Sequence, residues 1–118
     1  MDSRPSDLLP LKPLHFLMLL ALSDRERHAY GIKKDLAARG DHREIGPGTL
    51  YRSMAQLIDA GLIAESDRRP AADLDDERRR YYRLTPFGRR VLIAEARRLE
   101  GLVDAARARK LITHPGRA

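Results

Sequence analysis

Residues 46–61 read Gly-Pro-Gly-Thr-Leu-Tyr-Arg-Ser-Met-Ala-Gln-Leu-Ile-Asp-Ala-Gly, and this stretch decides the fold. Pro47 suits the first turn of a helix, where its missing N–H has no partner to lose, and Gly61 is a natural stop. Apolar residues recur at helical spacing, at Leu50, Met54, Leu57 and Ile58. The stretch therefore predicts an amphipathic helix that packs on one face and leaves the other face free for recognition.

Two further helices are expected upstream of this one. The first begins at Pro13 and runs to about Ser23, with one apolar face made by Leu14, Leu17, Leu20 and Ala21. Residues 24–28 are charged and indicate a connection. The second helix follows and ends at Gly40, and its apolar positions are Ile32, Leu36 and Ala37. Three short helices, the last two joined by a short polar linker, predict a helix-turn-helix.

The pattern changes after Gly61. Two short segments, 62–64 and 81–85, are rich in β-formers or aromatic residues and flank the very polar stretch 67–80. They predict a two-stranded hairpin with a long loop, which is the wing of a winged helix-turn-helix. The expected fold is therefore mainly α within the α+β class, with a three-helix core, a two-stranded β wing and a long C-terminal helix.

That C-terminal helix is expected to begin at Pro86 and to reach about residue 112, a length of about 40 Å. Its apolar residues follow alternating steps of four and three, at Leu92, Ala96, Leu99, Val103 and Ala106, with charged residues such as Glu95 and Arg98 around them. This is a heptad seam, and a seam needs a partner helix. Its first turns could fold back on their own domain, but a body this small cannot cover the full length. We therefore expect a homodimer.

Composition favours a polyanionic partner. The chain of 118 residues has a formal net charge of +6 and a pI near 10.2, so nucleic acid and an acidic membrane surface are both candidates, although modest basicity also serves solubility alone. The apolar stretch 14–22 is far shorter than the roughly 20 residues that cross a bilayer. The absence of cysteine excludes disulfides, Cys-bound zinc and a Cys nucleophile, and it favours a reducing cytoplasm.

The sequence offers no constellation for catalysis. Its four histidines stand at unrelated spacings, at His15, His28, His42 and His114, so we expect no metal site. The run Gly46-Pro47-Gly48 lacks the Lys-Ser or Lys-Thr that follows in a phosphate-binding loop. We predict a protein that is not an enzyme and that has no catalytic residue and no cofactor.

Three groups of residues are candidates for meeting double-stranded DNA. A major groove admits one α-helix, whose first turns reach the base edges, so Arg52 is the candidate for a guanine contact, and Thr49 and Tyr51 for a phosphate or a thymine methyl group. The loop arginines would follow a minor groove, and the remaining cations would touch phosphates. The predicted DNA-binding residues are Lys33, Lys34, Arg43, Gly48, Thr49, Tyr51, Arg52, Arg68, Arg69, Arg78, Arg79 and Arg80.

The third helix and the loop arginines each have a simpler interpretation. The polar face of the third helix could be merely solvated, as in an ordinary amphipathic helix. The loop arginines could be neutralised by the acids between them, which are Asp73, Asp75, Asp76 and Glu77. A basic winged helix could also serve as a protein-interaction module for an acidic partner, because fold alone does not settle function.

Several short motifs occur in a specific order along residues 11–110: Tyr30-Gly31, Gly48-Thr49-Leu50-Tyr51, Gly61-Leu62-Ile63, Tyr81-Tyr82-Arg83-Leu84-Thr85 and Gly88. Together they resemble the PadR family of bacterial transcriptional regulators. The resemblance implies a winged helix-turn-helix, a homodimer formed through the C-terminal helix, and repression that a ligand or signal relieves. It places Gly48, Thr49, Tyr51 and Arg52 on the recognition helix and Tyr82 and Arg83 on the second wing strand.

The chain resembles the short subgroup of that family, because it has a single C-terminal helix. We expect a DNA-binding domain at 11–85, a dimerisation helix at 86–112, and disordered tails at 1–10 and 113–118. The predicted function is a cytoplasmic, sequence-specific repressor that binds a palindromic operator as a homodimer. Some family members bind aromatic or drug-like compounds at the dimer interface, but this chain has no Trp and few aromatic residues there, so its sequence gives no support for a small-molecule effector.

Overall fold

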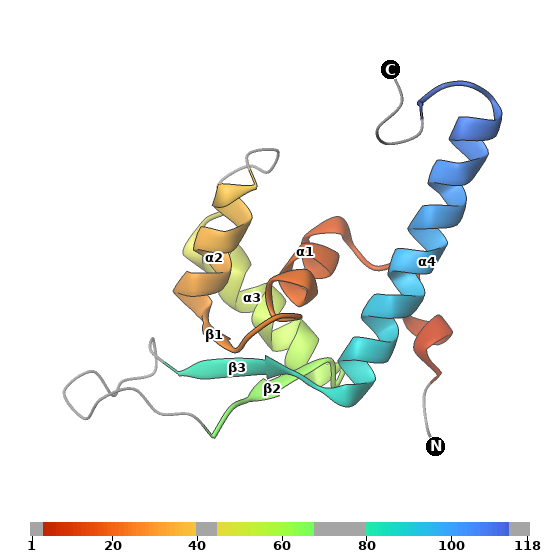
Figure 1. The fold of residues 1–118 in the computed structure, drawn as a ribbon. Coiled ribbons are helices and arrows are strands. Elements are labelled where there is room, and N and C mark those ends of the chain that lie inside the picture. The colour runs from red at the N-terminus through yellow and green to blue at the C-terminus, as the bar shows by residue number, and fades with distance from the viewer. Residues whose placement is uncertain (1–3, 40–44, 68–79, 114–118) are drawn as a thin grey trace.

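The computed structural model describes residues 4–39, 45–67 and 80–113 (Figure 1). Three helices and a small sheet form a body, and a long last helix leaves it and extends beyond it. The elements in chain order are η1 (Pro5–Leu8), α1 (Pro13–Ala21), β1 (Arg27–His28), α2 (Ala29–Ala38), α3 (Pro47–Asp59), β2 (Ile63–Glu65), β3 (Tyr81–Leu84) and α4 (Pro86–Ala108). The predicted mainly helical winged helix is confirmed.

The helix starts follow the sequence signals. A proline opens α1, α3 and α4, where its fixed φ is already helical. At the start of α4, the Thr85 hydroxyl accepts a hydrogen bond from the Gly88 N–H at 2.8 Å and donates one to the Gly61 carbonyl at 2.6 Å. Gly61 itself has φ +77, a left-handed conformation that glycine adopts without strain. This cap therefore joins the end of α3 to the start of α4.

The sheet has three strands rather than the expected two, in the order β1-β3-β2. Both pairings are antiparallel: Arg27 lies opposite Tyr82, and Glu65 lies opposite Tyr82 from the other side. We had expected residues 24–28 to be only a connection. A strand of two residues has no periodicity to detect, and it forms here because β3 has a free edge for it.

The core lies between α1, α2, α3, the sheet and the first turns of α4. Its fully buried apolar side chains include Met18, Leu19, Ile32, Leu36, Leu57, Ile63 and Val91. On α1 the buried face is made by Met18, Leu19 and Ala21, whereas Leu14 and Leu17 are only partly buried. Because α1 is apolar all round, its periodicity does not identify the buried face.

The N-terminal segment corrects a second expectation. Residues 1–10 were expected to form a disordered tail, but η1 lies within them and packs against α4. The Leu11 N–H donates a hydrogen bond to Glu95 Oε2 at 2.8 Å, and Arg98 pairs with the same carboxylate. Glu95 was expected at the surface beside the seam, yet it is only 1% exposed. It ties the N-terminal segment to α4.

The last helix also ends earlier than expected, at Ala108 instead of about residue 112. Lys110 has φ 62, and the Leu111 N–H donates to the Ala106 carbonyl at 3.0 Å. This hydrogen bond is typical of a helix that ends with one residue in the left-handed conformation. A non-glycine residue takes the left-handed position, so no glycine signalled the end in the sequence.

The close approach of α4 to the turn after α3 gives a stability prediction. A Cβ on Gly88 would lie 2.0 Å from the Leu62 carbonyl oxygen, whereas a Cβ on Gly101 would meet nothing within 4 Å. Gly88→Ala should therefore lower the free energy of unfolding by about 3 kcal/mol through backbone displacement. Gly101→Ala should raise it by about 0.5–1 kcal/mol through helix propensity. Urea unfolding at one fixed protein concentration measures both, and equal stabilities for the two variants would contradict the packing described here.

The buried carboxylate gives a pH prediction. The hydrogen bond from Arg98, aided by the Leu11 N–H, holds the pKa of Glu95 below its usual value despite its burial. A lowered folded-state pKa contributes stability above the unfolded-state pKa, and this contribution is lost as the pH falls through the folded-state value. Glu95→Gln should therefore lower the free energy of unfolding by about 2 kcal/mol at neutral pH.

At acid pH the difference in the free energy of unfolding between the wild type and Glu95→Gln should disappear. The exposed Glu100 provides the control, because Glu100→Gln on the same helix should change little at any pH. Urea unfolding across a pH series measures the difference. A gap between wild type and Glu95→Gln that is constant from neutral to acid pH would contradict the assignment.

Candidate nucleic-acid interface

Helix α3 has one buried and one open face. Leu50, Ser53, Met54 and Leu57 are buried against the body. On the open face, Thr49 and Arg52 are exposed, and Tyr51 is 46% exposed. Gly48 lies beside them in the first turn, and the N-cap residue is Gly46, which has no side chain to occupy the first N–H groups. The open face and the helix start together match the shape and donors that a major groove and its phosphate require.

Two residues of α3 lie on the face opposite to the one that their polarity predicts. Ser53 is polar but buried, and Ile58, which was grouped with the packing residues, is 42% exposed. The buried stripe lies at residues 50, 53, 54 and 57. Ser53 is small enough to pack in this stripe. Polarity alone therefore does not predict which face of α3 Ser53 and Ile58 occupy.

The two lysines of helix α2, Lys33 and Lys34, differ in their exposure to solvent. Lys34 is exposed, and its ammonium lies 5.8 Å from the centre of the Tyr30 ring. Lys33 is half-buried. His28 was not identified in the sequence: its Nδ1 accepts the Gly31 N–H at 2.9 Å and so caps α2, and its ring lies edge-on to Tyr81 of β3 at 5.5 Å. A histidine is uncommon as a helix cap, which is why no sequence signal marked it.

The wing residues are only partly described. Arg80 directly precedes β3, at the point where the long loop meets the two strands. Its Nη1 is 3.1 Å from Oε2 of Glu65, the last residue of β2. Arg83 is exposed on β3, and Tyr82 is half-buried. Arg80 therefore binds the stem of the wing together as well as carrying charge. The other predicted basic residues lie outside the described part of the chain: Arg43, Arg68, Arg69, Arg78 and Arg79.

The expected seam on α4 divides into two parts. Leu92 is 6% exposed and belongs to the core of its own domain, so its place on an intermolecular seam was wrong. Ala96 and Val103 are exposed, and Leu99 and Ala106 are half-buried. Leu102, next to the seam, is 57% exposed. Figure 1 shows that this second half of α4 extends beyond the three-helix body.

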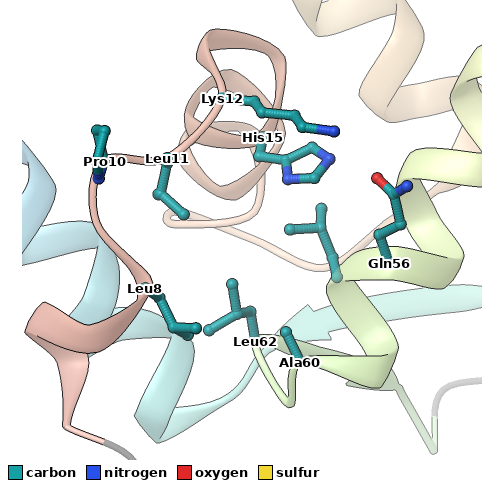
Figure 2. A pocket seen from close by; sticks show the side chains of 9 residues that line it. Leu8, Pro10, Leu11, Lys12, His15, Gln56, Ala60 and Leu62 are labelled. Carbon is teal, nitrogen blue, oxygen red and sulfur yellow. The ribbon is translucent and has the colours of Figure 1, made fainter.

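The described residues form no metal site, because none of their His, Asp and Glu side chains gather in groups of three that could hold a metal ion. None of their helices is both long and apolar enough to span a membrane. A cavity of about 230 Å³ does lie between the N-terminal segment, α1 and α3 (Figure 2).

A winged helix with an open third helix and a protruding last helix defines a class of protein, the winged-helix transcription regulators. Within that class, the transcriptional regulator PadR-like family matches residues 18–94. The chain belongs to this family, as its motifs predicted, and it is a transcriptional regulator and not an enzyme.

Individual relatives agree with this assignment. The transcriptional regulator Rv3488 of Mycobacterium tuberculosis is 36% identical over 89 residues, which are 75% of this chain and 76% of that protein. A PadR family transcription regulator from hypervirulent Clostridium difficile has a similar structure, with a TM-score of 0.70 at 20% identity over 82% of this chain and 97% of that one. A PadR family transcriptional regulator from Eggerthella lenta gives a TM-score of 0.61 at 31% identity over 83% of each chain.

Proposed function

We propose that this regulator is a homodimeric repressor that binds a palindromic operator in double-stranded DNA. The observation that carries the proposal is the pairing of two surfaces on one rigid body. The open face of α3 has the dimensions and donors for a major groove, and the uncovered half of α4 has an apolar stripe for a second copy. Membership of the PadR-like family supports both surfaces.

Base recognition is proposed for the first turns of α3. Arg52 would donate to the O6 and N7 acceptors of a guanine, which is the commonest specific contact in a major groove. Thr49 and Tyr51 would contact a phosphate or a thymine methyl group. Gly48, with no side chain, would let a phosphate approach the backbone at the helix start.

Contacts to the DNA backbone are proposed for the surrounding cations. Lys34 is exposed on α2, the helix that precedes α3, and Arg83 is exposed on the wing. Such contacts strengthen binding to every sequence and fix the register of the protein on the duplex. The same role is proposed for Lys33, for Arg80 and for the predicted arginines outside the described residues.

Dimerisation is proposed through α4 from Ala96 onward. The stripe of Ala96, Leu99, Val103 and Ala106, widened by Leu102, runs along the part of the helix that extends beyond the body. A two-fold axis there relates the two copies of α3, so that they would meet half-sites about one turn of DNA apart, roughly 34–36 Å. A dimer that covers this length of a promoter would exclude other proteins from it, and this supports repression.

The proposal is tested by selecting bound sequences from a random duplex pool with the purified protein at low and at high salt. We expect an enriched palindrome with half-sites about one turn apart, and affinity that falls steeply with salt as counterions are released. A folded, dimeric protein that enriches no sequence at either salt would contradict the proposal. Binding of acidic proteins would then be the function to examine.

Recognition by Arg52 can be separated from attraction to phosphates. Arg52→Ala should weaken binding to the selected sequence by about 1–3 kcal/mol and relax base preference at one position of each half-site. Lys34→Ala should weaken binding to selected and random duplexes equally and reduce the salt slope by about one unit per protomer. Fluorescence anisotropy titrations on both duplexes measure these effects. Equal losses on selected and random DNA for Arg52→Ala would remove this residue as a base reader.

The dimer surface gives a further prediction. Val103→Glu would bury an unpaired carboxylate in the interface, at a cost of about 3–5 kcal/mol, so the dissociation constant of the dimer should rise by at least about 100-fold. Ala105→Glu places the same group on an exposed part of α4 away from the stripe and should leave the dimer intact. Sedimentation velocity measures the association state. Dimers of equal strength in both variants would place the interface elsewhere.

A further inference from the structure

The cavity of about 230 Å³ has an aliphatic floor. It is walled by Leu8 and Leu11 of the N-terminal segment, by Leu57 and Ala60 of α3, and by Leu62 just after α3. Figure 2 shows Leu8, Ala60 and Leu62 gathered at one end of it. An enclosed cavity of roughly 150 Å³ lined by Leu, Ile and Phe accepts benzene. This cavity is larger and open to solvent on one side, so its apolar floor suits a chain of about six to eight carbon atoms.

The opposite side of the cavity is polar and cationic. Lys12 and His15 of the α1 start lie next to each other there, and Gln56 of α3 faces them (Figure 2). Within the described residues, no carboxylate pairs with Lys12 and no acidic side chain lines the cavity. Burial, with the charge of Lys12 nearby, holds the pKa of His15 below its usual value. This shift favours the neutral imidazole, and Lys12 supplies the positive charge.

We propose that this cavity binds an aliphatic monocarboxylate of about six to eight carbons, with the carboxylate against Lys12, and that its binding changes the affinity for DNA. One cation at the rim calls for one negative charge on the ligand. The side chains of the floor are aliphatic, and the one aromatic ring among the described lining residues, the His15 imidazole, lies on the polar side, which favours an alkyl chain on the floor. His15 and Gln56 provide hydrogen-bond donors for the second carboxylate oxygen.

The place of the cavity explains how binding would reach the DNA. One wall belongs to α3, which carries the proposed base reader Arg52. The other wall belongs to the segment that the Leu11 N–H ties to Glu95 of α4. A ligand between these walls contacts the reading helix directly, and it reaches the dimer helix through the N-terminal segment that Glu95 holds. If its affinity differs between the DNA-bound and free arrangements of α3, binding of ligand and DNA is coupled, and this part of the inference rests on the proposed function.

The site is tested first without DNA, by calorimetric titration of the full chain with octanoate. Octan-1-ol serves as the neutral ligand of equal length. Lys12→Met keeps the apolar stem and removes the charge, so it should weaken octanoate binding by about tenfold or more and leave octan-1-ol binding unchanged. Lys34→Met removes the same group far from the cavity and should bind octanoate as the wild type does.

A second variant tests the cavity by volume. Ala60 lines the cavity and is exposed, so it is not part of the buried core. The variant Ala60→Leu should therefore fold, and its larger side chain should fill the cavity floor and prevent binding of both octanoate and octan-1-ol. The site is overturned if octanoate fails to bind the wild type at millimolar concentration. It is also overturned if octanoate binds the wild type, Lys12→Met and Ala60→Leu equally.

The coupling is tested on the selected duplex. Octanoate should change the affinity of the wild type for this DNA by about fivefold or more and should have no effect on Lys12→Met. Octanoate binding without any change in DNA affinity would overturn the regulatory role and leave the site standing. Absence of DNA recognition in the selection would instead remove the proposed function, and the titrations without DNA would still decide whether the site exists.

Discussion

The junction between the end of α3 and the start of α4 is the constraint on which the rest of the structure depends. Gly61 turns the chain in a left-handed conformation, the Thr85 hydroxyl donates to its carbonyl, and the Thr85 N–H donates to the carbonyl of Leu62 at 3.1 Å. The first turn of α4 then passes so close to Leu62 that only a glycine fits at position 88. These contacts fix the angle between the helix proposed to face DNA and the helix proposed to form the dimer.

The opposite side of α4 is held by a second tie. Glu95 is buried between the N-terminal segment and Arg98, so it attaches the segment that carries Leu11 to α4. Between the two ties lies the cavity, with one wall on each side. The body thus holds the helix proposed to face DNA, a helix with an exposed apolar stripe and a ligand-sized space in one connected arrangement. That connection is the physical basis of the effector site proposed above.

Long periodic elements could be predicted from the sequence, and short or mixed ones could not. The proline starts and the apolar spacing of residues 50–57 identified α3, and the family motifs identified the winged helix. The strand at Arg27 and His28 has only two residues, and its formation depends on an edge of β3 that is distant in sequence. Polarity alone does not predict the places of Ser53 and Ile58: Ser53 is small enough to pack in the buried stripe, and Ile58 lies beside the stripe and is exposed.

The seam on α4 shows the same limit. A heptad pattern reports which residues share a stripe, but it does not report which partner covers them. Leu92 packs inside its own domain because the body reaches that far along α4, whereas Val103 lies beyond it. Glu95 was assigned to the surface by its charge, and the two groups that stabilise it there, the Leu11 N–H and Arg98, come together only in the fold. The DNA-binding residues remain predictions, and among the described ones Lys34, Thr49, Tyr51 and Arg52 are exposed.

The central claim is that a dimer through α4 holds two copies of α3 one turn of DNA apart. Because the chain has no cysteine, Ala55→Cys on the exposed face of α3 gives one unique site per protomer for a spin label. Double electron–electron resonance on this variant, without DNA, measures the distance between the two labels. The account predicts one distribution centred at about 34–36 Å, broadened by the label. A decay without dipolar modulation, or a distance far from one turn, would contradict it.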